Sequence, residues 1–239
     1  MKAFASIPAQ IPRSGIREIM DLAWAVEKTG EVIHLEVGQP DFDTPSHIVE
    51  ATCRYANAGN TKYVPNAGVD PLREAAARYF ERNTGIATGA NNILVTPGAV
   101  MSVATSFLAL LEPGDEVLLP DPGWPNYHMA VSIVHGKSVF YNLRAENHFL
   151  PDLDEIERLV SAKTKLILLC TPSNPTGQVY DEALMRDLMQ FAQRHDLWVL
   201  SDEIYGDIVF DEKHHSALPH DEDGRTLIVS GMSKSYAMT

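Results

Sequence analysis

Short apolar runs alternate with amphipathic segments through the second part of the chain. Runs of four or five mostly apolar residues, typical of buried strands, occur at Ile93–Thr96, Glu116–Leu119, Lys137–Tyr141, Leu166–Cys170, Trp198–Ser201 and Leu227–Ser230. Helical spacing of apolar residues separates these runs at Val100–Leu111, Asn126–His135, Leu153–Ala162 and Asp181–His195. Strands that alternate with helices favour a mostly parallel sheet with helices on both faces. We therefore expect an α/β fold of three layers.

The N-terminal part of the chain follows a different pattern. Apolar residues at helical spacing predict a helix over Ser14–Thr29, and a short apolar run predicts a strand over Val32–Val37. A loop rich in Gly, Pro and Asp follows, in which Thr44 is placed to cap a helix that has Pro45 at its first position. A further helix begins at Asp70.

Composition and charge argue against a nucleic-acid-binding, membrane-spanning or secreted protein. The 239 residues suffice for one large domain or one and a half, and 45% of them are hydrophobic. The net charge of −13, from 19 basic and 32 acidic residues, argues against nucleic acid or an anionic membrane as a partner. Apolar runs stay well short of the ~20 residues of a membrane span, and the N-terminus lacks the apolar core of a signal peptide. We interpret Cys53 and Cys170 as reduced core residues of a cytoplasmic protein.

Histidines gather in one polar stretch, Asp211–Arg225. His214, His215 and His220 could imitate a metal site there. A hydrophilic loop explains them better, because it requires no second shell of partners around metal ligands. We expect no metal.

Chemically capable side chains follow the carboxyl ends of the predicted strands. In open α/β sheets these ends meet at one crevice, where ligands bind. Five strand ends would deliver to that crevice Gly98 and Ala99, Trp124, Asn174, Asp202 with Tyr205, and Lys234.

Each of these residues suggests a role. Gly98 and Ala99 lie at a helix start, where free backbone N–H groups form a phosphate cradle, but the glycine pattern of NAD sites and the P-loop lysine of ATP sites are missing. Trp124 offers a flat face to a planar ligand or merely packs its loop. Asp202 directly follows a buried strand, and a buried carboxylate needs a cationic partner. Tyr205 could share that site.

Two further residues complete the set. Asn174 lies between two prolines that force a sharp exit from the strand, and a cis X-Pro bond would fix its amide further. Lys234 follows the last strand and would project an amine into the crevice. An amine, a buried acid, a phenol, an amide, an aromatic plate and a phosphate cradle together are the inventory that pyridoxal phosphate requires.

The motifs TPGA, SNPTG, SDEIYGD and SGMSKSYAMT occur in an order and spacing that resemble the class I/II pyridoxal-phosphate aminotransferases of fold type I, the aspartate aminotransferase superfamily. The resemblance runs from the Ser14–Met20 region to Thr239. It implies that pyridoxal 5'-phosphate forms an internal aldimine with Lys234 and that Asp202 pairs with its ring nitrogen. It also implies that Tyr205 and Asn174 hold the phenolic oxygen.

The resemblance assigns the remaining site residues as well. It implies that Trp124 stacks on the ring and that the turn opened by Gly98 binds the phosphate. It also implies that Gly38, Trp124 and Asn174 contact the substrate. The residues that would bind the phosphate are Ala99, Val100 and Ser233. Tyr63 matches a tyrosine that reaches the cofactor of the other subunit, which implies a homodimer.

Two departures from the family pattern shape the expectation. The sequence stops before the two arginines that bind phosphate and substrate carboxylate in the family, so we expect an incomplete chain that is inactive by itself. Residues 1–45 would then form an arm and helix of the small domain, and residues 46–239 an incomplete large domain. Aspartate- and prephenate-type members carry a lysine at the position of Val100, so dicarboxylic substrates become less favoured.

The resemblance implies a transaminase that exchanges an amino group between an L-amino acid and a 2-oxo acid. A pyridoxal-phosphate C–S β-lyase with the same fold and the same lysine, aspartate and tyrosine is the alternative, and an inactive fragment is another. A non-catalytic half of a transcription regulator would need a basic helix-turn-helix region before the fold, and residues 1–30 contain none.

Overall fold

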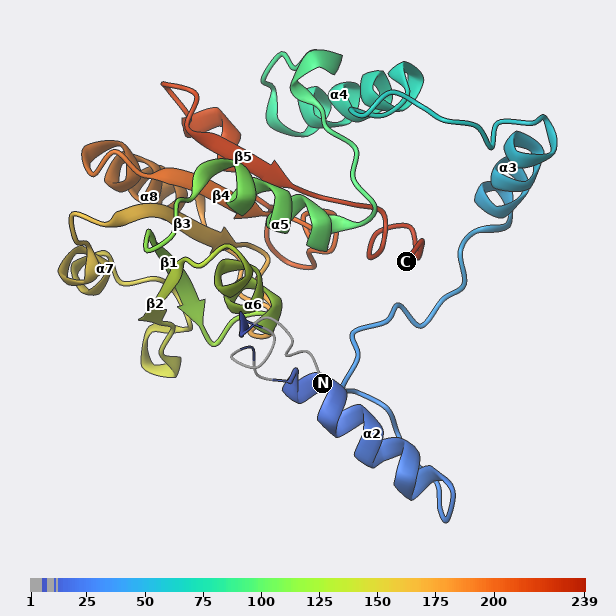
Figure 1. The fold of residues 1–239 in the computed structure, drawn as a ribbon, viewed down its shortest axis with the longest axis horizontal. Coiled ribbons are helices and arrows are strands. Elements are labelled where there is room, and N and C mark those ends of the chain that lie inside the picture. The colour runs from blue at the N-terminus through green and yellow to red at the C-terminus, as the bar shows by residue number, and fades with distance from the viewer. Residues whose placement is uncertain (1–5, 8–10, 12) are drawn as a thin grey trace.

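A five-stranded parallel sheet forms the centre of the molecule (Figure 1). The computed structural model describes residues 6, 7, 11 and 13–239. The strands lie in the order β2-β1-β3-β4-β5. Their bounds are Glu116–Asp121 for β1, Lys137–Asn142 for β2, Thr164–Cys170 for β3, Trp198–Asp202 for β4 and Thr226–Val229 for β5. The predicted parallel α/β sheet is confirmed.

Helices cover both faces of the sheet, as expected for parallel strands joined by crossovers. One face carries α5 (Ala99–Leu110) and α6 (Pro125–Ile133), and the other carries α7 (Leu153–Leu159) and α8 (Glu182–Arg194). The remaining helices are α2 (Gly15–Glu27), α3 (Ser46–Asn57), α4 (Asp70–Thr84) and three short 3-10 turns, Ala90–Asn92, Ala145–Asn147 and Leu218–His220. The predicted three-layer arrangement is therefore present.

Each strand feeds both cores because successive side chains point to opposite faces. Along β3, Ile167 and Leu169 pack with α7 and α8, whereas Leu166, Leu168 and Cys170 pack with α5 and α6. All five residues are at most 1% exposed. Burial on both faces explains why these strands are continuous apolar runs.

Two predicted strands are not strands in the structure. Ile93–Thr96 joins no ladder, because its backbone is held by neighbours outside the sheet: Val95 donates its N–H to Ala67 O at 3.0 Å, and Arg73 Nε donates to Ile93 O at 3.1 Å. Val32–Val37 belongs to no strand, and Glu36 and Val37 lie in a bend. The apolar pattern of both segments predicted a ladder incorrectly, because pairing needs a partner strand that the local pattern does not contain.

Two local expectations are also corrected. Thr44 does not cap the next helix: Pro45 is the N-cap residue of α3, and the Thr44 hydroxyl donates instead to Ala237 O at 2.6 Å. That contact ties the loop after Val37 to the last residues of the chain. Cys53 is exposed on α3 and is not a core residue, whereas Cys170 is buried as expected.

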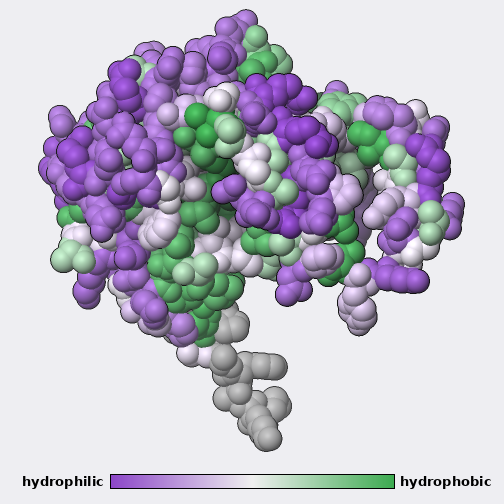
Figure 2. Space-filling model, turned by 90° about the horizontal axis from the view of Figure 1, so that it is seen from above, coloured by the Kyte–Doolittle hydropathy of each residue, from purple (hydrophilic) through white to green (hydrophobic). Residues whose placement is uncertain are grey.

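The N-terminal elements extend away from the layered core (Figure 1). α3 stands apart between two extended segments. The apolar stripe of α2 buries only Met20, and Leu22 stays 63% exposed. Ile33 and Leu35 in the following segment are each 87% exposed. The view from above shows hydrophobic surface flanked by hydrophilic areas (Figure 2), and exposed apolar patches bordered by polar residues mark interaction surfaces.

Helices in the described part of the chain lack the combined length and hydropathy needed to cross a membrane.

The exposed apolar segment predicts self-association. Covering one fully exposed Ile or Leu side chain is worth about 1.5–3 kcal/mol. Ile33→Glu with Leu35→Glu should therefore raise the monomer fraction without unfolding the sheet, as measured by sedimentation velocity over a concentration series. Gln39→Glu with Thr61→Glu adds the same charge at exposed polar positions and should change little. Equal effects of the two pairs would show that net charge, not apolar contact, controls association.

Candidate active site

Asp202 is the most deeply buried acid at the carboxyl edge of the sheet. It ends β4, pairs in register with Cys170 and Val229, and is 3% exposed. Its Oδ2 accepts a hydrogen bond from Tyr127 Oη at 2.6 Å, and its Oδ1 accepts one from the Ile204 backbone N–H at 3.2 Å. We expected a cationic partner, but both partners present among the described residues are neutral. The site thus holds a carboxylate whose charge is uncompensated.

Burial changes the acidity of this group. Desolvation raises the pKa of Asp202 from 3.8 to about 6, and the neighbouring Glu203 charge adds to the rise. The hydrogen bonds from Tyr127 and Ile204 lower the pKa and oppose that rise. A cation against the free side of Asp202 would favour the charged form further.

Tyr127 was not among the residues chosen from the sequence. It lies three positions after Trp124, in the first turn of α6, and is 2% exposed. The rings of Trp124 and Tyr127 meet edge to face, with centroids 5.3 Å apart and planes at 86°. Spacing of i and i+3 at a helix start would have placed the two side chains together, but nothing in the local pattern points to an acid 75 residues away.

Lys234 lies in the loop that follows β5 and is partly buried. Its Nζ donates to the backbone oxygen of Gly38 at 2.6 Å and stands 5.7 Å from the centroid of the Tyr205 ring. Burial lowers the pKa of the amine. A lysine that loses its proton more readily is better suited to nucleophilic and proton-transfer chemistry.

Tyr205 and Asn174 come from the loops after two neighbouring strands, β4 and β3. Burial raises the pKa of Tyr205, while a hydrogen bond with the Asn174 side chain lowers it. A tight turn holds Asn174: Gly177 N–H donates to Ser173 O at 2.8 Å, and the Thr171–Pro172 and Asn174–Pro175 bonds are cis, as the sequence suggested. The phenol and the amide therefore share one side of the crevice.

The start of α5 lies beside the lysine loop. Gly98 precedes the helix with φ +85°, a conformation that other residues rarely adopt, and leaves the first N–H groups of the helix without intrahelical partners. A Cβ placed on Gly231 would lie 3.9 Å from Ala99 Cβ, so the loop that carries Ser233 packs against this helix end. Val100 is 45% exposed in the same turn.

Most predicted site residues therefore meet at one edge of the sheet. The number of strands that end there is four, whereas five were expected. Four strands, β1, β3, β4 and β5, end at the site, while Gly98 and Ala99 arrive from the unpaired segment Ile93–Thr96. Gly38 is joined to the site through Lys234. Tyr63 is not: its side chain is fully exposed between α3 and α4.

Glu203, next to Asp202, serves a different purpose. Its Oε1 accepts hydrogen bonds from Ser201 Oγ at 2.9 Å, Ser216 Oγ at 3.0 Å and Ala217 N–H at 3.0 Å, and His214 Nε2 lies 3.0 Å from its Oε2. This fully occupied carboxylate anchors the polar loop that follows β4. His214 therefore has a structural partner, and no cluster in the described part of the chain has the composition of a metal site.

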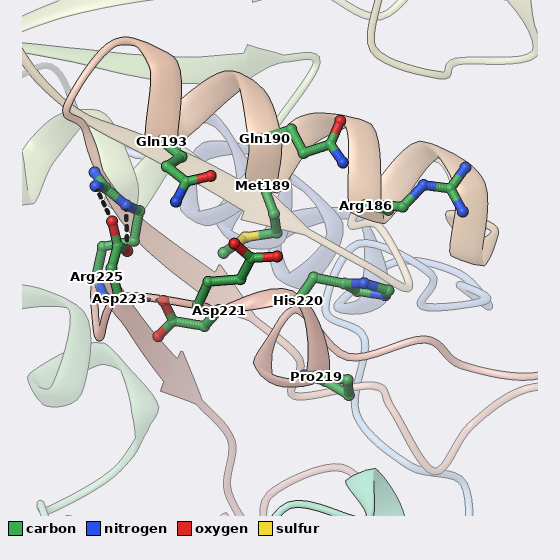
Figure 3. Close-up of a pocket in the computed structure, with 10 residues that line it drawn as sticks. Arg186, Met189, Gln190, Gln193, Pro219, His220, Asp221, Asp223 and Arg225 are labelled. Atoms are coloured by element: carbon green, nitrogen blue, oxygen red, sulfur yellow. Dashed lines mark hydrogen bonds and ion pairs between the residues drawn. The ribbon is translucent and has the colours of Figure 1, made fainter.

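Two concavities lie outside this set of residues. One, of about 550 Å³, opens between α4 and the loop after β4 and is bordered by Glu203 and Ser230. The other, of about 120 Å³, lies between α8 and the segment before β5 (Figure 3). There Arg225 pairs with Asp223 and donates to Leu197 O at 2.9 Å, so its guanidinium is engaged in the fold. Because Arg225 precedes β5, this concavity lies at the opposite end of that strand from Lys234.

Burial of Asp202 predicts a pH-dependent cost to stability. Between the unfolded pKa of 3.8 and the folded pKa of about 6, the native state keeps a proton that the unfolded state loses, so raising the pH lowers the free energy of unfolding. Two pH units correspond to about 3 kcal/mol. Relative to the original protein, Asp202→Asn should therefore gain about 3 kcal/mol in unfolding free energy between pH 4 and pH 8, measured by denaturant unfolding without cofactor.

Glu203→Ala is the matched control. It removes the acceptor of four donors and should destabilise the protein, whereas Asp202→Asn should change chiefly the pH dependence. A stability difference between Asp202→Asn and the original protein that stays constant from pH 4 to pH 8 would contradict the raised pKa of Asp202.

Comparison with known proteins gives a consistent answer. Residues 30–239 match the family described as aminotransferase class I and II. The chain is 38% identical over 229 residues to the probable aspartate aminotransferase of Methanocaldococcus jannaschii, covering 96% of this chain and 59% of that protein. It is 38% identical over 230 residues to aromatic-amino-acid aminotransferase 2 of Thermococcus litoralis, covering 95% and 58%.

Solved structures agree with the sequence relatives. The aspartate aminotransferase of Thermus thermophilus with maleate superposes with a TM-score of 0.95 at 33% identity, over 100% of this chain and 62% of that one. The chain thus spans about 60% of the length of the relatives that it matches. The family match extends from the loop before Gly38 to the lysine loop and includes every motif that meets at the carboxyl edge of the sheet. The chain belongs to the class I and II aminotransferase family.

Proposed function

We propose that the protein is a pyridoxal-phosphate-dependent transaminase, exchanging an amino group between an L-amino acid and a 2-oxo acid with Lys234 as the residue that carries the cofactor. The observation that supports this most directly is Asp202, a buried carboxylate whose partners among the described residues are all neutral, at the same sheet edge as a partly buried lysine. A pyridinium nitrogen is the kind of cation such a carboxylate requires.

The residues present fit the cofactor. Asp202 would pair with the ring nitrogen, Tyr205 and Asn174 would hold the phenolic oxygen, and Trp124 would stack on the ring. The open N–H groups at the start of α5, with Ser233, suit a phosphate, because the positive end of a helix attracts anions. Ala99 and Val100 supply those N–H groups, and Gly98 allows the close approach.

Pyridoxal phosphate, when bound, supplies an electron sink for the substrate's α-carbon. The protein's own groups would do the rest. Lys234, whose pKa is lowered by burial, would take the proton from the substrate's α-carbon as a neutral amine and, as the ammonium so formed, would donate it to the carbon that was the cofactor's aldehyde carbon. Asp202 would stay anionic above pH 6 and keep its partner protonated. Tyr205, whose pKa is raised, would remain a hydrogen-bond donor.

The backbone of Gly38 would contact Lys234 and the substrate in turn. Its carbonyl holds the lysine amine at 2.6 Å in this structure. The Thr44–Ala237 hydrogen bond holds the same loop against the end of the lysine segment. We propose that the backbone of Gly38 contacts the substrate carboxylate once Lys234 has turned toward the cofactor.

The partner and domain proposals rest on exposure. Tyr63, fully exposed here, would reach the phosphate site of a second copy in a homodimer. Residues 1–45, whose helix α2 buries only Met20, would belong with a small domain, and residues 46–239 would form the cofactor-binding domain. A second copy and a small domain would each bury apolar side chains that are exposed to solvent in this chain.

Substrate selection should depend on Val100. This side chain cannot pair with a second carboxylate, so we propose monocarboxylic amino acids as the preferred substrates, although the relatives named above include aspartate aminotransferases.

Covalent trapping tests the role of Lys234. Protein incubated with pyridoxal phosphate and reduced with borohydride should carry the adduct on the peptide that contains Lys234, as located by mass spectrometry. Lys234→Ala should reduce labelling to background, and Lys165→Ala, at an exposed lysine of β3, should leave it unchanged. An adduct mapped to Lys165 in the original protein would reject the proposed role.

Product analysis in the active enzyme tests the reaction and its substrate class. Transfer of ¹⁵N from an amino acid to a 2-oxo acid is expected, whereas pyruvate and free ammonia from cysteine conjugates would indicate the β-lyase. Val100→Lys should raise kcat/KM for aspartate relative to a monocarboxylic substrate by roughly tenfold, the effect of one charge-assisted hydrogen bond. Met101→Lys, at the next exposed position of α5, is the control. Equal gains in the two variants would reject a specific role for position 100.

A further inference from the structure

Tyr127 contacts both Asp202 and Trp124, which in the proposed site would bind the edge and the face of a planar ligand. Its hydroxyl donates to Asp202 Oδ2 at 2.6 Å, and its ring supports Trp124 edge to face at 5.3 Å. The side chain is 2% exposed and packs in the core between the sheet and helices α5 and α6. Tyr127 therefore contributes to the position of both the Asp202 carboxylate and the Trp124 ring.

The hydroxyl can serve only as a donor at ordinary pH. Burial, and then the Asp202 charge beside it, raise the pKa of Tyr127 well above its usual value, so the phenol keeps its proton. Hydrogen bonds to an ionised acceptor are the shorter and stronger kind. The Tyr127 contact therefore stabilises the anionic form of Asp202 relative to the protonated form.

Other groups around Asp202 do not supply this effect. Cys170, its register partner on β3, is a buried thiol whose pKa is raised to about 12 by desolvation, and it donates weakly to Pro172 O at 3.7 Å. Glu203 carries a like charge that raises the pKa of Asp202. Tyr205 makes no hydrogen bond to Asp202 among the described residues. Within the described part of the chain, the Ile204 N–H is the one further donor to Asp202, at the longer distance of 3.2 Å.

From this geometry we infer that Tyr127 is a positioning residue for the proposed reaction: its hydroxyl holds Asp202 ionised and oriented for the cofactor's ring nitrogen. This inference rests on the proposed function for the identity of the ligand. It adds a residue to the site that none of the family motifs quoted above contains, and its effect reaches the cofactor through Asp202.

The variant that isolates the hydroxyl is Tyr127→Phe, because the ring that supports Trp124 remains. Tyr141→Phe is the matched control: Tyr141 is 0% exposed, and its hydroxyl donates to Leu168 O at 2.8 Å in the core on the other face of the sheet. Both variants remove one buried tyrosine hydroxyl, but only one of those hydroxyls touches Asp202.

The first measurement needs no cofactor. The carboxyl ¹³C shift of Asp202, assigned with Asp202→Asn, reports its titration. In Tyr127→Phe the midpoint should rise by about one to two pH units, the value of a hydrogen bond to a charged group. In Tyr141→Phe it should not move. An unchanged midpoint in Tyr127→Phe would overturn the inference, whether or not the protein binds pyridoxal phosphate.

The second measurement is the dissociation constant of pyridoxal phosphate across pH. Tyr127→Phe should bind about three to twenty-five times more weakly at pH 6.5, because a midpoint raised from about 6 to about 7–8 leaves a smaller ionised fraction of Asp202, and the deficit should shrink toward pH 9 as Asp202 ionises. In an Asp202→Asn background, Tyr127→Phe should cause no further pH-dependent loss. A deficit that is equal at every pH, or that persists in that background, would mean that Tyr127 acts only by packing. Absence of binding by the original protein would instead count against the proposed function.

Discussion

Asp202 is the group on which the rest of the site depends, because it is a carboxylate buried with neutral partners. Each structural feature around it bears on its ionisation. Its place at the end of β4, between β3 and β5, removes it from water, and Tyr127 and Ile204 supply the hydrogen bonds that oppose protonation. A buried charge of this kind is costly unless it is paired. Keeping Asp202 buried therefore costs the fold stability once the pH rises above the unfolded pKa of this acid.

The parallel sheet brings the other candidate site residues to the same edge as Asp202. Strands β1, β3, β4 and β5 run in the same direction, so their carboxyl ends bring the loops that carry Trp124, Asn174, Tyr205 and Lys234 to one edge. Glu203 shows how the scaffold is secured: its carboxylate, directly beside the acid, contacts three residues of the loop after β4, His214, Ser216 and Ala217. Membership of the class I and II aminotransferase family accords with this arrangement.

Sequence reasoning recovered what periodicity and strand ends encode. Five strands were predicted correctly from their buried apolar runs, and the sequence placed Asn174, Asp202, Tyr205 and Lys234 at the carboxyl edge of the sheet because each follows one of those runs. Ile93–Thr96 was wrongly predicted as a strand, since an extended pattern does not reveal whether a ladder partner exists. Tyr127 was missed because a tyrosine in an amphipathic helix looks like a core residue, and its acceptor lies on a strand far away in the sequence. Those contacts are tertiary, and local patterns do not contain them.

The most direct test of the account concerns the state of the cofactor's ring nitrogen when it faces Asp202. Pyridoxal phosphate labelled with ¹⁵N in the ring, bound to the protein at pH 8, should give the ¹⁵N chemical shift of a protonated pyridinium, and this shift should revert to that of a neutral pyridine in Asp202→Asn. A neutral-pyridine shift in the original protein, or a pyridinium shift that survives Asp202→Asn, would contradict the claim that Asp202 is the cofactor's acid partner.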